Sequence, residues 1–242
     1  MTGVQTCALP ISPHGSMLPT SPVRKNIFMV AFALGLLIPI VIIFMRENMN
    51  TRVRGRKDLE NLTIPFIGEI PLFTRKKKGI LGKKPQEVKA VIVKEGNRDI
   101  INEAFRVLRT NLEFMTGKDK ASNVIIVTSF NPGSGKSFLT MNIAVSFAIK
   151  GKKVLVIDGD LRHGSASSYI DSPTKGLSDY LGGRIDNLNE IIVTNPKQKY
   201  LDILPVGTIP PNPTELLFDD RLKQVIDTVR EQYEYVLIDC PP

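Results

Sequence analysis

The chain has 242 residues, a formal net charge of +8 and two cysteines, Cys7 and Cys240. Because Cys7 lies in the suspected artefact at the start of the sequence, no disulfide framework can be argued, and the C-terminal part of the chain is expected to be cytosolic. The positive charge is concentrated in residues 46–96, which hold 13 Lys/Arg and 6 Asp/Glu, whereas residues 97–242 sum to −1. This placement favours a membrane surface over nucleic acid as the partner of the basic residues, with a solvated linker as the alternative.

The two ends of the sequence indicate a fragment of a longer gene. Residues 1–11 resemble the translation of a common sequencing adaptor, and we exclude them as an artefact. Residues 12–26 form a Pro-containing segment. At the other end the sequence stops at Pro242, directly after an acidic motif. We therefore expect that both natural ends lie outside this sequence.

Residues 27–45 form an uncharged apolar stretch of 19 residues. A helix of that length spans about 28 Å, close to the hydrocarbon thickness of a bilayer. A signal peptide, with a shorter apolar core, and a buried soluble helix are the alternatives. Arg24 and Lys25 precede the stretch, whereas five basic residues follow it closely, which places residues 12–26 outside the cytoplasm and the C-terminal side inside. The sequence therefore predicts one transmembrane helix, followed by a basic juxtamembrane linker over residues 46–96.

The next predicted element is a helix over about residues 98–115. Its apolar residues recur at spacings of four and three and form one stripe, which consists of Ile101, Phe105, Leu108, Leu112 and Met115. Three charged residues, Glu103, Arg106 and Arg109, lie off this stripe. Taken alone they predict only local ion pairs, each worth roughly 0.2–0.5 kcal/mol.

From Asn123 onward, short apolar runs alternate with helical segments. Such alternation is typical of an α/β domain whose parallel sheet is covered by helices on both faces. The predicted strands are residues 124–129, 153–158, 201–206 and 235–239, and the predicted helices are residues 136–149 and 214–232.

Residues 131–137 read Asn-Pro-Gly-Ser-Gly-Lys-Ser between a predicted strand and a predicted helix, which is the layout of a phosphate-binding P-loop. The two glycines lack a Cβ and would let the backbone approach a polyphosphate, and the helix that follows would supply free N–H groups. Lys136 would reach the β- and γ-phosphates, and the Ser137 hydroxyl would coordinate Mg²⁺. The full pattern has Gly where this chain has Phe130, so a Gly-rich turn with a chance Gly-Lys-Ser is the alternative.

Two acidic motifs each follow a predicted strand. The first delivers Asp158, Asp160 and Arg162, and the second delivers Asp239. Ligands of a doubly wound sheet bind at the carboxyl ends of its strands, and Mg²⁺ prefers carboxylates together with water and phosphate oxygens. A single Asp after a strand is more often a helix N-cap, but three of them beside a P-loop predict a metal–nucleotide site.

Together these motifs resemble those of the bacterial tyrosine kinases (BY-kinases) that are fused to polysaccharide co-polymerase membrane domains, the Wzc-like proteins. The resemblance covers residues from about 20 to 242. Residues 131–137 resemble the Walker A motif of the family, residues 158–162 its Walker A′ motif and residues 238–242 its Walker B motif. The helix that carries Glu103, Arg106 and Arg109 matches the E-x-x-R-x-x-R oligomerisation motif.

The resemblance implies a P-loop NTPase-type doubly wound parallel sheet, incomplete at the C-terminus, in a cytoplasmic kinase domain over residues 97–242. It implies ATP and Mg²⁺ as cofactors and phosphoryl transfer to tyrosines near the C-terminus of a neighbouring subunit. Lys136 would offset phosphate charge, Asp158 would orient or accept the tyrosine proton, and Asp160 would act at the metal. The implied nucleotide-binding residues are Asn131, Pro132, Gly133, Ser134, Gly135, Lys136, Ser137 and Arg162, and the implied metal ligands are Ser137, Asp160 and, through water, Asp239.

The family also implies a homo-oligomeric ring through Glu103, Arg106 and Arg109 at the bacterial inner membrane. This ring would contact the lipid bilayer and the polysaccharide export and polymerisation machinery, and would regulate exopolysaccharide chain length and export. The tyrosines of this chain are scattered, and we expect structural roles for all of them: Tyr169, Tyr180, Tyr200, Tyr233 and Tyr235.

Two other functions remain open. One is a polysaccharide chain-length regulator that binds ATP without kinase activity. The other is a membrane-tethered ParA/MinD-like ATPase, although those ATPases carry a second lysine where this chain has Asn131. Because its sheet would be incomplete, we also expect the chain to fold poorly when expressed alone, and a cooperative thermal unfolding transition would refute this.

Overall fold

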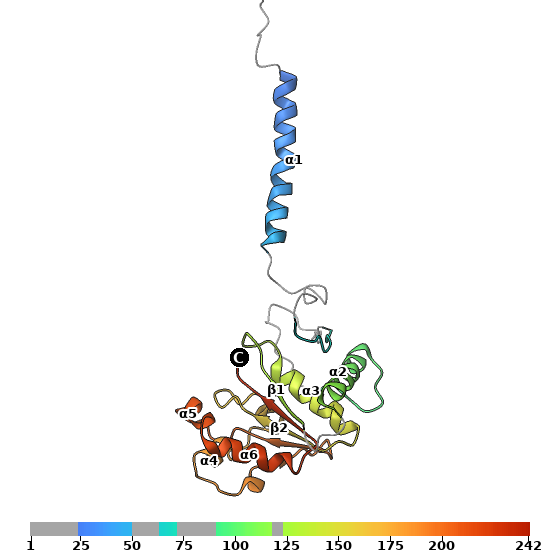
Figure 1. Cartoon of the computed structure of the whole chain (residues 1–242). Helices are drawn as coiled ribbons and strands as arrows, with labels where there is room; N and C mark the ends of the chain where they lie inside the picture. Colours follow the sequence, from blue (N-terminus) through green and yellow to red (C-terminus); the bar gives the residue numbers. More distant parts are fainter. Residues whose placement is uncertain (1–23, 50–62, 72–90, 118–122) are drawn as a thin grey trace, which may run out of the picture. The chain divides into compact units, whose positions relative to one another are not determined.

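The computed structural model describes residues 24–49, 63–71, 91–117 and 123–242. The chain divides into two compact units, Met1–Pro65 and Phe66–Pro242, and each is described by itself (Figure 1). The predicted adaptor artefact, most of the predicted extracytoplasmic segment and most of the predicted basic linker lie outside the described residues.

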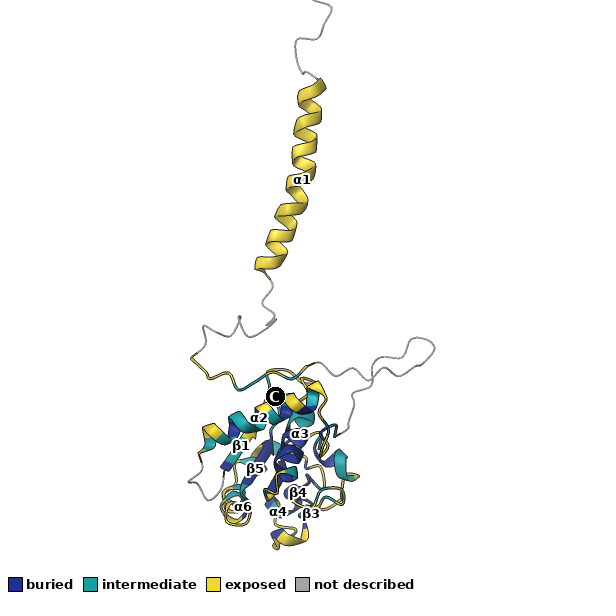
Figure 2. Cartoon of the chain, turned by 90° about the vertical axis from the view of Figure 1, so that its right-hand side faces the viewer, coloured by how far each residue is buried: buried dark blue, intermediate teal, exposed yellow. Residues whose placement is uncertain are grey.

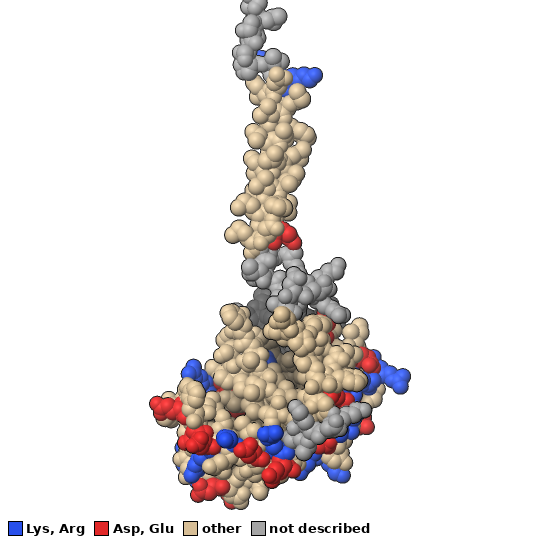
Figure 3. Space-filling model, viewed as in Figure 1, with Lys and Arg blue, Asp and Glu red and all other residues tan. Residues whose placement is uncertain are grey.

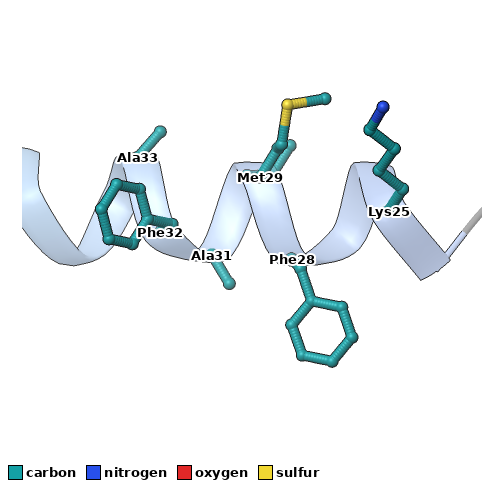
Figure 4. A pocket seen from close by; sticks show the side chains of 7 residues that line it. Lys25, Phe28, Met29, Ala31, Phe32 and Ala33 are labelled. Carbon is teal, nitrogen blue, oxygen red and sulfur yellow. The ribbon is translucent and has the colours of Figure 1, made fainter.

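The first unit contains α1 (Arg24–Asn48), a 25-residue helix with Pro39 inside it. None of its residues is buried (Figure 2), and on the face seen in Figure 3 its charged side chains lie only near its ends. Its apolar side chains point to all sides of the axis, as Figure 4 shows for Phe28 and Met29. Within the described residues, α1 is the one helix long and apolar enough to cross a membrane by length and composition. The predicted span of residues 27–45 lies inside it.

The second unit is built on a five-stranded sheet with the order β1-β5-β2-β4-β3. Its strands are β1 (Asn123–Val127), β2 (Val154–Asp158), β3 (Val193–Thr194), β4 (Leu201–Leu204) and β5 (Tyr235–Asp239). The strands β1, β5, β2 and β4 are parallel, which confirms the predicted parallel sheet, and their ends lie within two residues of the predicted ones. The two-residue strand β3 pairs antiparallel with β4 and was not predicted.

Helices cover both faces of this sheet. On one face α2 (Ile100–Thr116) packs against α3 (Lys136–Ile149), and on the other lie α4 (Leu177–Leu181) and α6 (Asp220–Arg230). The side chains of β2 alternate between the two cores, because successive residues of a strand point to opposite faces. Val154 and Val156 join the core with α2 and α3, whereas Leu155 and Ile157 join the core with α4 and α6. The all-apolar run of β2 is therefore explained by burial on both faces.

The predicted apolar stripe of α2 is correct except at its end. Phe105, Leu108 and Leu112 are buried, and Phe105 meets Phe138 of α3 edge to face with ring centroids 6.2 Å apart. Met115 is 54% exposed, so it does not belong to the core. The helix begins after Asp99, whose side chain accepts a hydrogen bond from the Asn102 N–H at 2.7 Å.

The single helix predicted over residues 214–232 is wrong. The chain forms α5 (Pro213–Leu217) and then α6, with a break at Asp219. The backbone of Asp219 is extended, and its carboxylate accepts a hydrogen bond from the Arg221 N–H at 2.8 Å. An aspartate that caps a new helix competes with helix continuation, and this favours the break.

Within the second unit, two short segments of the predicted linker pack against α2 and α3. Asn111 of α2 donates a hydrogen bond to the carbonyl of Ile67 at 2.6 Å, and Ile67 and Ile70 contact the core. Further on, the side-chain oxygen of Asn142 in α3 accepts hydrogen bonds from the N–H groups of Ile92 and Val93. The amide side chains of Asn111, which is half-buried, and of Asn142, which is fully buried, therefore attach these segments to the helical layer of α2 and α3.

Candidate nucleotide-binding site

The P-loop joins β1 to α3 through a backbone that requires glycine. Gly133 and Gly135 have φ angles of 72° and 89°, in the left-handed region that side chains disfavour. Gly135 is the N-cap of α3 and Lys136 its first residue, so Lys136 and Ser137 lie at the end where backbone N–H groups lack helical acceptors. Phe130, which replaces the first glycine of the full pattern, is 96% exposed and does not crowd the loop.

Hydroxyl groups brace the middle of the loop. Ser129 and Ser134 each donate a hydrogen bond to the carbonyl of Asn131, at 2.9 and 2.6 Å. Asn131, which stands where ParA/MinD-like ATPases carry a second lysine, therefore accepts both hydrogen bonds through its backbone carbonyl. The loop as a whole is exposed, whereas most of the residues of α3 after its first turn are buried.

The carboxyl ends of β2 and β5 lie side by side. Asp158 and Asp239 are partners in the parallel register, and both are fully buried. The Gly159 N–H donates to the Asp239 carbonyl at 2.9 Å, and a Cβ at position 159 would lie only 3.2 Å from that oxygen. Glycine therefore allows the chain after β2 to run against β5, and Asp160, 5% exposed, remains beside both acids.

Asp239 is the least satisfied group of this region. Neither of its carboxylate oxygens makes a hydrogen bond of normal geometry to the described residues. Burial raises the pKa of Asp239, the Ser137 hydroxyl and the Lys136 ammonium oppose this rise, and the negative charge of Asp160 adds to it. Lys136, Ser137 and Asp160 thus all lie close enough to Asp239 to act on its charge.

Asp158 is buried equally deeply but is held by hydrogen bonds. Burial raises its pKa from 3.8 to about 6, hydrogen bonds from the Ser167 side chain and backbone oppose the rise, and the charge of Asp239 adds to it. The Ser167 hydroxyl and N–H donate to Asp158 Oδ2 at 2.7 and 2.6 Å. Sequence reasoning missed Ser167, because a serine nine residues after an aspartate carries no local signal.

The carboxylate of Asp160 makes only long polar contacts with the described residues. The N–H groups of Arg162 and His163 and the ring Nδ1 of His163 each lie 3.3 Å from its Oδ1. Arg162, which we predicted at the nucleotide, places its guanidinium 3.5 Å from the Thr214 hydroxyl at the start of α5. The structure therefore brings together the P-loop residues and the three acids, and connects Arg162 to α5.

The donor set at this site suits a hard divalent cation. Among the described residues, no three His, Cys, Asp or Glu side chains lie close enough together to hold a metal by themselves. Mg²⁺ does not require such a cage, since it uses one or two carboxylates together with phosphate oxygens and water. The two unpartnered oxygens of Asp239, the Ser137 hydroxyl and the carboxylate of Asp160 fit this partial shell.

The charged residues of α2 lie apart from these groups. Arg106 forms the predicted local ion pair with Glu103 at 2.8 Å. Arg109 forms no such pair: its Nη1 donates to the Ser146 carbonyl of α3 at 2.8 Å, and its buried Nε has no hydrogen-bond partner among the described residues. The local ion-pair interpretation therefore holds for Arg106 but not for Arg109.

Two of the five tyrosines, Tyr233 and Tyr235, have contacts that suit the predicted structural role, whereas Tyr200 is 42% exposed. Tyr235 is buried and stacks on Phe147 with ring centroids 4.0 Å apart. The Tyr233 hydroxyl donates to Asp202 at 2.8 Å, and burial raises the pKa of Tyr233. Neither side chain is presented to solvent as an acceptor hydroxyl would be.

Comparisons with known proteins point to one group of relatives. An AAA domain family matches residues 122–242. The chain is 32% identical over 235 residues to the tyrosine-protein kinase etk of Escherichia coli K12, covering 93% of this chain and 32% of that protein. It is 29% identical over 227 residues to the tyrosine-protein kinase ptk of Acinetobacter johnsonii, and the match covers 93% of this chain and 30% of that protein. The chain thus spans about a third of the length of these curated relatives.

Two solved structures are similar in fold as well as in sequence. The kinase domain of Escherichia coli tyrosine kinase ETK is 32% identical, with a TM-score of 0.67 over 79% of this chain and 74% of that one. The chimerical protein CapA2B2 is 30% identical, with a TM-score of 0.63, and the match covers 78% of this chain and 76% of that one.

Proposed function

Because this chain belongs to the bacterial tyrosine-protein kinases, with an AAA domain over residues 122–242, we propose that it binds Mg·ATP and transfers the γ-phosphoryl group to tyrosine hydroxyls. The observation that carries this proposal is Asp239, which lies beside Lys136 and Ser137, is fully buried and makes no hydrogen bond of normal geometry to the described residues. A buried carboxylate without partners is costly, so its presence at a P-loop is best explained by a ligand that completes its contacts.

The residues of the site then take distinct roles. Lys136 and the N–H groups at the start of α3 stabilise negative charge on the phosphates. Ser137, Asp160 and, through water, Asp239 would hold Mg²⁺, which would supply positive charge to offset the charge of the phosphates. Asp158, whose carboxylate is fixed in place, orients the acceptor tyrosine hydroxyl and accepts its hydrogen bond. The remaining P-loop residues, Asn131 to Gly135, shape the turn around the phosphates.

The place and assembly of the kinase are part of the same proposal. The apolar helix α1 anchors the chain in the bacterial inner membrane, with the kinase domain in the cytoplasm. Glu103, Arg106 and Arg109 contact a neighbouring subunit of a ring that acts with polysaccharide export and polymerisation machinery and regulates exopolysaccharide chain length. Support comes from the exposed Glu103–Arg106 pair and from the buried Arg109 Nε, which has no hydrogen-bond partner in the part of the chain that the structure describes.

The proposal is tested by phosphoryl transfer. The chain in lipid nanodiscs is incubated with Mg·ATP and a Glu/Tyr copolymer, and phosphotyrosine is detected. Lys136→Met should abolish the signal, whereas Lys150→Met should retain it, because Lys150 lies at the other end of α3 and pairs with Glu113. If the wild-type chain binds ATP but labels no tyrosine, the kinase proposal is eliminated and the regulator without kinase activity is favoured.

A further inference from the structure

Ser167 holds the carboxylate of Asp158 with two hydrogen bonds. It begins the short 3₁₀ helix η2 (Ser167–Ile170) and is itself buried. Its N–H and its hydroxyl both donate to Asp158 Oδ2, at 2.6 and 2.7 Å. The other oxygen, Oδ1, receives only a long contact of 3.3 Å from the Asp160 N–H. The two oxygens of Asp158 are therefore in different states: Oδ2 is occupied by Ser167, and Oδ1 is left to interact with something else.

The direction of the Ser167 hydroxyl is fixed by a third group. The N–H of Val206, in the segment after β4, lies 2.9 Å from Ser167 Oγ. A backbone N–H can only donate, so Oγ is the acceptor there, and the single hydroxyl proton is free to point at Asp158. The hydrogen bonds run in one direction, from Val206 to Ser167 to Asp158.

The backbone around Val206, where this series of hydrogen bonds starts, is itself held in place by contacts with α4. Its carbonyl accepts from the Ser178 N–H at 2.9 Å. Two residues later, the Thr208 N–H donates to the buried carboxylate of Asp179 at 3.1 Å. A Cβ on Gly176 would collide with the backbone of residues 205–207, so the segment after β4 lies tightly against α4. Asp158 is thus held through Ser167 against a well-anchored part of the fold.

We propose that Ser167 is a positioning residue for phosphoryl transfer, which fixes the Asp158 carboxylate so that Oδ1 faces the acceptor tyrosine. The inference rests on the proposed kinase function. If Ser167 only satisfied a buried carboxylate, its loss would weaken the fold and nucleotide binding together. As a positioning residue it acts on the chemical step, because small displacements of a reacting group are costly in rate while the phosphate contacts of the P-loop stay intact.

The test compares two neighbouring serines of η2. Ser167→Ala removes the hydroxyl that holds Asp158, whereas Ser168→Ala removes a hydroxyl that donates only to the Ser165 carbonyl at 2.7 Å. With the nanodisc chain and the Glu/Tyr copolymer, Ser167→Ala should lower kcat by about 10- to 100-fold. The KM for ATP and the Kd for ADP should change by less than about threefold on the same argument. Ser168→Ala should match the wild type in all of these quantities.

Two further measurements separate positioning from simple stabilisation. In an Asp158→Asn background, Ser167→Ala should have little additional effect on kcat, because it acts through the carboxylate that is already changed. Hydrogen–deuterium exchange should show faster exchange of the Val206 amide in Ser167→Ala but not in Ser168→Ala, since only the first loses its acceptor.

Several results would overturn the inference. A Ser167→Ala chain with wild-type kcat would do so while leaving the kinase function intact. If Ser167→Ala lowered kcat and the affinity for ADP equally, Ser167 would be only a structural residue. The same would follow if the losses in kcat of Ser167→Ala and Asp158→Asn multiplied in the double variant. A wild-type chain without any transfer to tyrosine would instead overturn the proposed function, and this inference with it.

Discussion

Asp179 and Asp239 are both buried carboxylates of the same domain, but their surroundings differ completely. Asp179 accepts hydrogen bonds from the N–H groups of Gly176 and Thr208, at 3.0 and 3.1 Å, and pairs with Arg184 at 3.1 Å. Asp239 has no hydrogen-bond partner among the described residues, and burial raises its pKa. The first carboxylate joins α4 to the segment after β4, and the second is left open at the P-loop. The difference teaches that burial of a carboxylate does not by itself mark a ligand site, whereas a buried carboxylate without hydrogen bonds points to a ligand that completes its contacts.

The largest effect should come from crowding the satisfied carboxylate. Gly207 has a φ of 79°, and a Cβ there would collide both with Asp179 Oδ2 and with the backbone N–H of Gly176 that donates to it. We expect Gly207→Ala to lower the free energy of unfolding by more than about 3 kcal/mol, as measured by urea denaturation. Gly96→Ala is the matched control, because Gly96 has a similar φ of 74° but open space around its Cβ, and it should cost only about 1 kcal/mol. Equal losses in the two variants would show that the contact with Asp179 is loose.

Removing the satisfied carboxylate should be nearly as costly. Asp179→Ala leaves the buried Gly176 N–H, the part-buried Thr208 N–H and the half-exposed Arg184 guanidinium without their acceptor, and we expect a loss of about 3 kcal/mol. Asp179→Asn retains one acceptor oxygen and should lose less. A loss below about 1 kcal/mol for the alanine variant would contradict the contrast with Asp239.

We expect the buried charge of Asp158 to lower the free energy of unfolding of the nucleotide-free chain, by an amount that depends on pH. Its pKa is 3.8 in an unperturbed state and about 6 in the fold, so the folded chain binds more protons and loses stability as the pH rises between these values. Without nucleotide, Asp158→Asn should therefore be more stable than the wild type near pH 8, by up to about 3 kcal/mol. The two unfolding curves should converge near pH 4. A difference in stability that does not change with pH would contradict this explanation.

The smallest change in stability is expected at the unsatisfied carboxylate, and its sign should be opposite to that at Asp179. Asp239→Asn removes an unpartnered buried charge and should raise the free energy of unfolding by about 1 kcal/mol. The same variant should lose the increase in Tm that Mg·ADP gives the wild type. If Asp239→Asn lowered the free energy of unfolding and its Tm still rose with Mg·ADP, Asp239 would behave as a structural acid like Asp179.

Much of the site could be predicted because its members are marked by local patterns. Lys136 and Ser137 follow a Gly-containing loop, and Asp158 and Asp239 each end a buried apolar strand. In a parallel sheet such ends meet at one edge, so the sequence positions of the strands were enough to bring these side chains together. The break at Asp219 and the exposure of Met115 were mispredicted, because periodicity alone does not show where a cap ends a helix or where a neighbouring element stops.

The sequence by itself determined the apolar helix, the parallel sheet and the loop with its three acids, since each depends on the pattern of neighbouring residues. Only the tertiary structure decided which buried acid is satisfied and which is not. Ser167 lies 9 residues from Asp158, Thr208 lies 29 residues from Asp179, and Ser167 meets Val206 across 39 residues. Hydrogen bonds of this kind depend on how helices and strand ends pack in space, and a burial pattern along the sequence does not encode their direction.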